Sequence, residues 1–498
     1  DDLSFPYGEI ASTEHDRLVY GFGAGMRSGN HAFGVSARRQ ETGDTGNPPF
    51  PMDIRYFDTD MASATYKGDF EAFDFDARLD YTTVAHAMTN YHLRTPPTDM
   101  MRYRETFADA ESIGLDTSIS IPSENGEWRL GVDGEKADKN VLITNPNNAS
   151  FFLLTLPDIQ TQRTGAYVEW NGEYKAIHAE LGVRVDQHDM EASEAQVGSA
   201  VPMMPANLAN AFNAGPRDWD ATTLDAVARL WTPLNDNLTL RGTLARKSRA
   251  PGYLEVFAWL PTPASGGLAD GNIYIGNRDL DVETAWIIEG GFDWSNARAY
   301  ARPTIFLRQV DDYIQGAPYD ATPGVIDTPV EMVANMNGDA TPLIWSNVDA
   351  RLYGIDLDAG YRLNKNWRVD SVLSYVKAER RDIDDNLYRV APPNLRAGLT
   401  YETSNWSATL ETVMAAEQSD VSITNTEQET PGYVLLNMSG EVQLSDTVNV
   451  SFGVDNLLNH TWRDHLSGYN RVMASDVLVG QRLPGSERNA FIRLHISG

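Results

Sequence analysis

Residues 353–363, which read YGIDLDAGYRL, contain the pattern that decides the fold class. Apolar side chains occupy every second position of this segment: Tyr353, Ile355, Leu357, Ala359, Tyr361 and Leu363. The positions between them hold small or charged residues: Gly354, Asp356, Asp358, Gly360 and Arg362. Successive side chains of a β-strand point to opposite faces, so a period of two predicts a strand with one apolar and one charged face.

The same alternation recurs along the chain, in residues 70–82, 176–186 and 448–455. The helical spacing of three or four residues is hardly sustained anywhere, so the chain is predicted to be all-β. An apolar face opposite a charged face is what a strand needs when one face meets lipid and the other lines a polar lumen.

Two sizes of connection join these segments. The short ones are polar hairpin turns, at 170–173, 234–238, 363–367 and 444–448. The long ones are rich in Gly, Pro and Asp, around 40–58, 136–160, 191–220, 250–283, 315–345 and 463–485. Short turns at one end and long loops at the other are typical of barrels in the outer membrane. We therefore predict a transmembrane antiparallel β-barrel of about 22 strands, with short periplasmic turns, long extracellular loops and a lipid bilayer around it.

The composition excludes several classes of protein. The 498 residues include 70 Asp and Glu against 40 Lys and Arg, so the net charge is −30 and no nucleic-acid partner is expected. The absence of cysteine excludes disulfides, thiol nucleophiles and Cys-based zinc sites. No metalloprotease, nucleophile-elbow or phosphate-loop motif occurs in the sequence. We therefore expect a protein that is not an enzyme and requires no cofactor.

Several longer stretches resemble TonB-dependent outer-membrane receptors. They include LARKSRAPGYLEVF (244–257), GNRDLDVETAWIIEGGFDW (276–294), RVAPPNLRAGLTYE (389–402) and VNVSFGVDNLLNHTWRDHLS (448–467). The resemblance implies that residues 1–498 form one barrel domain in the outer membrane of a Gram-negative bacterium. It also implies uptake of a scarce ligand, with energy that TonB delivers to a plug inside the barrel.

A finer resemblance lies in LDYTTVAHAMTNYHLRTPPTDMMR (79–102). This stretch is similar to the copper-importing branch of the family, in which a His-x-Met pair of the barrel wall joins a Cys and a Met of the plug around the metal. The matching pair here is His86 and Met88. Residues two apart on a strand share a face, and the charged face of 74–82 continues to both of them, so they are expected in the lumen. Imidazole with thioether is a soft ligand set that suits copper.

His188 and Met190 form a second His-x-Met pair, which extends a lumen-facing register after Arg184 and Asp186. We take His86 and Met88 as the first choice for a metal site and His188 and Met190 as the second. The alternative for either pair is ordinary polar lining of a barrel. Copper is the expected transported ligand.

The sequence also departs from the family. The N-terminal plug of the family has no counterpart, because barrel-like alternation begins near residues 18–26. We therefore expect the plug, and contact with TonB through it, from a separate chain or a missing segment. Two other functions stay open: uptake of a siderophore or other organic chelate through the same architecture, and a passive pore or scaffold whose lumen a partner chain fills.

Overall fold

A computed structural model describes residues 3–497, and long β-strands form most of it. Within this range nineteen strands build the wall, ten from β3 to β12 and nine from β14 to β22. Their bounds are β3 (Arg17–Ser28), β4 (His31–Thr42), β5 (Asp53–Phe70), β6 (Phe73–Thr89), β7 (Glu105–Ser123), β8 (Gly126–Thr144), β9 (Phe152–Tyr174), β10 (Ile177–Glu191), β11 (Asp218–Asn235), β12 (Leu238–Arg249), β14 (Glu283–Ser295), β15 (Ala299–Pro318), β16 (Leu343–Arg362), β17 (Trp367–Arg380), β18 (Asn394–Glu402), β19 (Trp406–Ala415), β20 (Tyr433–Ser445), β21 (Val448–Asp455) and β22 (Asn489–Ile496).

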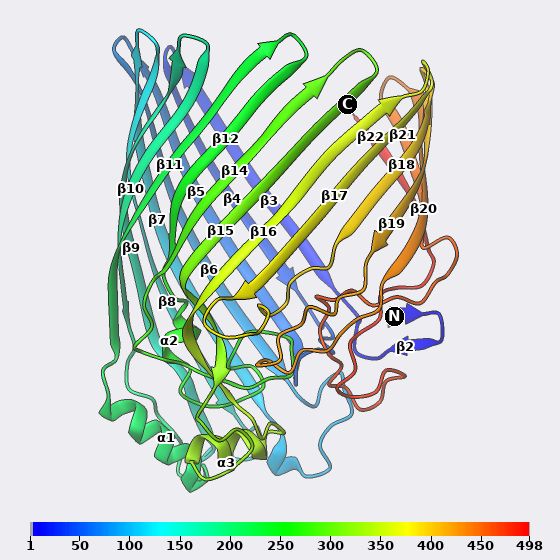
Figure 1. The fold of residues 1–498 in the computed structure, drawn as a ribbon. Helices are drawn as coiled ribbons and strands as arrows, with labels where there is room; N and C mark the ends of the chain where they lie inside the picture. The colour runs from blue at the N-terminus through cyan, green and yellow to red at the C-terminus, as the bar shows by residue number, and fades with distance from the viewer. Residues whose placement is uncertain (1–2, 498) are drawn as a thin grey trace.

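Each wall strand pairs with its neighbour along the chain in the antiparallel sense, and the strand order forms a closed barrel (Figure 1). Three short strands complete the 22 found in the described range. The strands β1 (Leu3–Phe5) and β2 (Gly8–Ile10) form a separate hairpin, and β13 (Tyr274–Ile275) pairs in parallel with the start of β16. The predicted all-β antiparallel barrel is confirmed.

The two ends of the barrel differ as the sequence predicts. Short turns close one end, at the top of Figure 1, and long loops with the helices α1 (Met203–Ala214), α2 (Tyr253–Phe257) and α3 (Pro329–Met336) gather at the other. A 3-10 turn, η1 (Met100–Arg102), lies in the loop after β6. Residues 136–160 are mostly strand, because β8 and β9 extend to Thr144 and Phe152. The wall is therefore taller on that side than the sequence pattern suggested.

The outer face of the wall is apolar over its middle. Outward side chains such as Leu79, Leu115, Ile305 and Leu307 are exposed although they are large and hydrophobic. Exposed apolar area in a continuous band is what contact with lipid requires. Near the short turns, aromatic pairs such as Trp128–Trp170 and Trp367–Tyr401 lie on this face, as in an interfacial girdle. Among residues 3–497, no helix has the length and apolar character needed to cross a membrane.

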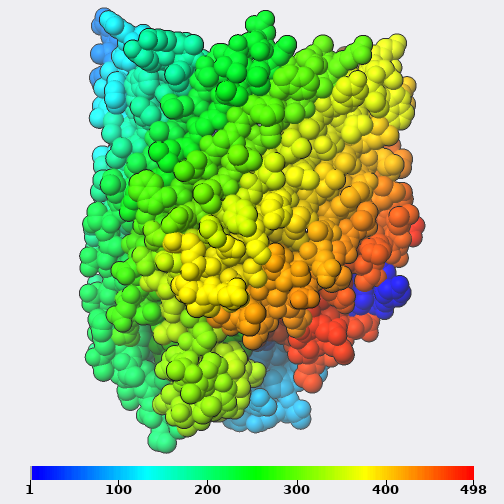
Figure 2. All heavy atoms as spheres, viewed as in Figure 1, coloured from blue at the N-terminus to red at the C-terminus, as the bar shows by residue number. Residues whose placement is uncertain are grey.

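The long loops interlock over the extracellular mouth. The backbone N–H of Tyr469, in the loop after β21, donates to the carbonyl of Ala269 in the loop after β12, and that of Arg471 donates to Pro48 in the loop after β4. A separate apolar cluster around Phe257 and Trp259 joins residues of the loops after β8, β10, β12 and β15. Figure 2 shows the N-terminal hairpin (blue) against the segment after β21 (red). The loops thus form a cap over the lumen.

Candidate functional site

The first-choice pair, His86 and Met88, lies near the end of β6 that leads into the long loop. The ladder between β6 and β7 has no irregularity, so His86 and Met88 share the face of Arg78 and Asp80. The opposite face carries the lipid-facing Leu79. The structure therefore places His86 and Met88 on the lumenal face of the wall.

His86 sits in an apolar setting. Its partners on the neighbouring strands are Phe57 of β5 and Ala108 of β7, and its ring centroid is 4.7 Å from that of Phe57. The Nε2 atom is buried, and no group among residues 3–497 forms a hydrogen bond with it. A buried polar atom without a partner is rare in a folded protein, and it is available to a metal that imidazole can bind.

Met52 is a third candidate ligand, and it lies near the cross-strand partner of Met88. That partner of Met88 on β7 is Thr106. The hydroxyl of Thr106 lies 3.1 Å from the Sδ atom of Met52, which belongs to the loop before β5. Sequence reasoning missed Met52, because only the pairing of β5, β6 and β7 brings it to the same place. The Met52 thioether thus contacts the cross-strand partner of Met88, and His86 pairs with Ala108 two residues further along the same strand.

The two residues of the second-choice pair, His188 and Met190, have different surroundings, one polar and one apolar. His188 and Met190 share the lumenal face of β10, four strands away from β6. The Nε2 atom of His188 lies 3.3 Å from the Thr223 hydroxyl. Met190 is buried in the apolar cluster under the loops, opposite Trp219. The structure does not bring the two His-x-Met pairs together, since four strand spacings amount to about 19 Å.

A network of ion pairs lies beside His188 on the lumenal wall. Arg163 contacts Asp133 at 2.6 Å and Asp186 at 2.8 Å. Arg184 contacts the same two carboxylates at 2.7 Å and 2.5 Å. Two guanidinium groups and two carboxylates balance one another here, and Asp116 and Asp225 line the same hollow. Of the four ion-paired residues, sequence reasoning had placed only Arg184 and Asp186 on the lumenal face.

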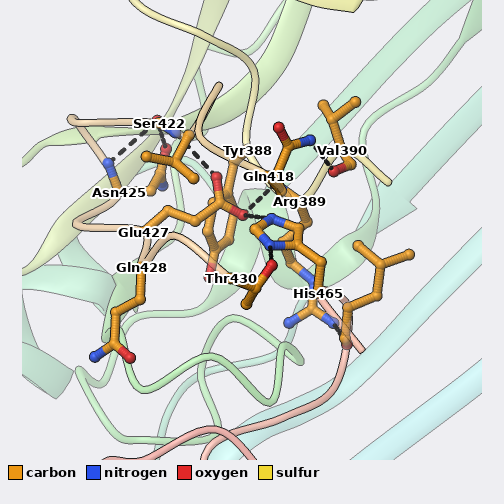
Figure 3. A network of polar contacts seen from close by, with 12 residues as sticks. Tyr388, Arg389, Val390, Gln418, Ser422, Asn425, Glu427, Gln428, Thr430 and His465 are labelled. Carbon is orange, nitrogen blue, oxygen red and sulfur yellow. Dashed lines mark hydrogen bonds and ion pairs between the residues drawn. The ribbon is translucent and has the colours of Figure 1, made fainter. Parts of the chain in front are cut away.

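A buried polar network joins three loops of the cap (Figure 3). His465, in the loop after β21, contacts Glu427, in the loop after β19, with 3.0 Å between Nε2 and Oε1. Its Nδ1 atom lies 2.9 Å from the Thr430 hydroxyl. The backbone N–H groups of Arg389 and Ser422 also donate to the Glu427 carboxylate, at 3.0 Å and 2.9 Å. This network holds the cap together over the mouth of the barrel.

A family model described as "TonB dependent receptor-like, beta-barrel" matches residues 5–457. The chain belongs to this family. It is therefore a TonB-dependent outer-membrane transporter of a Gram-negative bacterium, from a family of transporters and receptors, and it sits in a lipid bilayer.

Solved structures share the fold of this TonB-dependent transporter at low sequence identity. "Copper transporter OprC" is similar with a TM-score of 0.83 and 18% identity, over 100% of this chain and 74% of that chain. The FrpB iron transporter from Neisseria meningitidis has a TM-score of 0.67 and 14% identity, over 98% and 72%. The ferric yersiniabactin receptor FyuA from Yersinia pestis has 0.67 and 13%, over 100% and 73%. No curated protein sequence matches the chain.

Proposed function

We propose that this transporter takes up copper, and that His86 and Met88 bind the ion on the lumenal wall beneath the loop cap. The observation that carries the proposal is the buried Nε2 atom of His86, which has no hydrogen-bond partner in the described residues. Neutral imidazole and thioether together favour a soft ion, Cu(I) above all. Met52 would add a third soft ligand from the loop before β5.

The charge of the chain also favours a cation over an anionic chelate. A net charge of −30 attracts cations toward the mouth. An anionic iron chelate needs free guanidinium or ammonium groups, whereas Arg163 and Arg184 of the lumen are already held by Asp133 and Asp186. FrpB is named an iron transporter and FyuA a ferric yersiniabactin uptake receptor, so uptake of a siderophore or other organic chelate is the second candidate.

Uptake would proceed by capture and release. The ion enters through the loop cap and exchanges its water for the nitrogen of His86 and the sulfur of Met88. Release follows when a plug in the lumen, in the same polypeptide or a separate one, is moved by TonB. The residues of the wall supply a binding site of fixed geometry, because strands hold side chains more rigidly than loops do.

Copper binding by the purified protein tests the proposal. We expect the double variant His86→Ala with Met88→Ala to bind Cu(I) at least about 100-fold more weakly, since it loses two ligands. Met52→Ala should have a smaller effect in the same direction. His178→Ala is the matched control. His178 is also a lumenal histidine, but the residue two positions after it is Glu180, so it does not form a His-x-Met pair. Cu(I) affinity is measured by competition with a chromogenic chelator.

Unchanged affinity in the double variant would refute the site. Tight binding of a ferric siderophore together with no Cu(I) binding by the parent protein would favour the second candidate. Heat-modified mobility of the barrel on gels shows in each case that the variant is folded.

A further inference from the structure

The lipid face of the wall contains a hollow of about 290 Å³ between β8 and β14. It exists because β11 presents the small side chains of Ala226 and Ala228 outward. Larger outward side chains flank them on the neighbouring strands: Leu181 and Val183 of β10, and Leu244 of β12. The result is an apolar groove in a face that is otherwise filled by large side chains.

A positively charged side chain, Arg246, lies at one end of this groove. Arg246 of β12 faces Ala226 on one side and Trp286 of β14 on the other, and it lines the hollow. Its guanidinium donates to the hydroxyls of Ser248 at 3.0 Å and Thr284 at 3.3 Å, and to the carbonyl of Leu224. These acceptors carry no charge, and within residues 3–497 no carboxylate lies within ion-pair distance of Arg246.

Two other arginines of the outer face are neutralised. One of them, Arg351, lies in the same row of cross-strand partners as Arg246. Arg351 pairs with Glu379, and Arg381 pairs with Asp311 at 2.5 Å. The chain as a whole is strongly acidic, so an anionic group is repelled from most of its surface. The uncompensated charge of Arg246 therefore marks a place where an anion can approach the outer wall.

The groove has a direction relative to the membrane. Arg246 lies three residues before the end of β12, where the long extracellular loop begins. Trp128, the lining residue at the opposite end, lies two residues after the short periplasmic turn before β8. An occupant with its charged group at Arg246 would thus direct its apolar part toward the middle of the bilayer. That is the orientation of a lipid of the outer leaflet.

We propose that this groove is a binding site for a phosphorylated lipid of the outer leaflet. One acyl chain lies over Ala226 and Ala228, and the phosphate group accepts hydrogen bonds from Arg246, with Trp286 beside it at the interface. Guanidinium suits phosphate because its planar donors match two phosphate oxygens. A protein partner fits the groove poorly, since a stable protein interface needs roughly 800 Å² on each side.

Native mass spectrometry of the barrel from outer membranes, released in a mild detergent, tests the proposal. We expect a retained lipid whose mass includes phosphate. Arg246→Gln should reduce the retained fraction at least tenfold, and Arg246→Lys should restore part of it because the charge returns. Ala228→Phe should also reduce it by filling the groove. The matched controls are Arg351→Gln, which removes a paired arginine, and Ala64→Phe, which adds a ring to the lipid face of β5.

Rebinding of purified lipid A and of enzymatically dephosphorylated lipid A identifies the recognised group. The site is supported if the parent protein prefers phosphorylated lipid A and the Arg246→Gln variant loses this preference. Equal binding of both forms, equal losses in the controls, or a parent protein that retains no phosphorylated lipid would overturn it. Copper affinity is measured on the same samples, so failure of this inference is distinct from failure of the proposed function.

Discussion

Replacing Glu427 by Gln tests whether the buried network of Figure 3 keeps the loop cap closed. The side chains of Glu427 and His465 are both 1% exposed. Because a carboxylate only accepts, His465 Nε2 must donate to it, as do the backbone N–H groups of Arg389 and Ser422. The substituted amide would offer one oxygen and one NH2 group, so at least one of these buried donors would face another donor.

The hydrogen bonds to the Glu427 carboxylate set the size of the effect. A hydrogen bond to a charged group contributes roughly 1.5–3 kcal/mol, and a buried donor left without an acceptor costs roughly 1–3 kcal/mol. We therefore expect the free energy of opening of the cap to fall by about 3 kcal/mol. At about 1.4 kcal/mol for each factor of ten, amide exchange in the loops should accelerate by roughly 150-fold.

Hydrogen exchange followed by mass spectrometry measures this effect by segment. Faster exchange is expected in residues 381–393, 416–432 and 456–488, while the wall strands stay protected, because loops open locally without unfolding the barrel. Glu429→Gln is the matched control, since Glu429 lies in the same loop and is exposed. Equal acceleration in both variants, or none in Glu427→Gln, would refute the argument.

Two further predictions concern the loops and the wall. Burial raises the pKa of Asp385, but hydrogen bonds from Thr424, Ile423 and Asn386 lower it more, so its net pKa lies below the usual value. A carboxyl with a lowered pKa stabilises the folded state above its unfolded pKa of about 3.9, and this contribution is lost as pH falls through the folded pKa. The rate of amide hydrogen exchange in the loops, corrected for the intrinsic rate, should therefore stay constant down to about pH 4 and rise below it. The Asp385→Asn variant should not show this pH dependence. On the wall, Ile305→Arg places a charge on the lipid face and should cost about 2–4 kcal/mol of unfolding free energy in urea, whereas Thr304→Arg on the lumenal face should cost far less; equal costs would contradict the assigned faces.

The strand pattern and the two ends of the barrel were predictable from sequence. Alternation in segments such as 353–363 is a local property, because side-chain direction on a strand depends only on position along it. The difference between short turns and long loops is equally local, since turn residues such as those at 444–448 carry their own conformational preference. The lumenal placement of His86 and Met88 follows from the same counting.

The surroundings of those residues could not be predicted from sequence. Met52 approaches Thr106 only because three strands pair in one register, with an irregularity between Ile54 and Tyr56 that no local signal announces. Met190 has the same pattern as Met88 along its strand, yet it is buried under the folded loops. Loop packing joins residues far apart in sequence, and single-sequence patterns do not record such contacts.

Sequence alone thus determined the all-β architecture, the faces of the strands and the lumenal positions of the two His-x-Met pairs. The tertiary structure decided that His86 has a buried nitrogen without a hydrogen-bond partner in the described residues and that Met190 is buried under the loops. It also decided that Arg246 lines a groove in the lipid face. The physical reason is the range of the interactions. Strand alternation is fixed within a few residues, whereas burial, hydrogen-bond satisfaction and charge neutralisation depend on neighbours that only the closed barrel and its interlocked loops bring together.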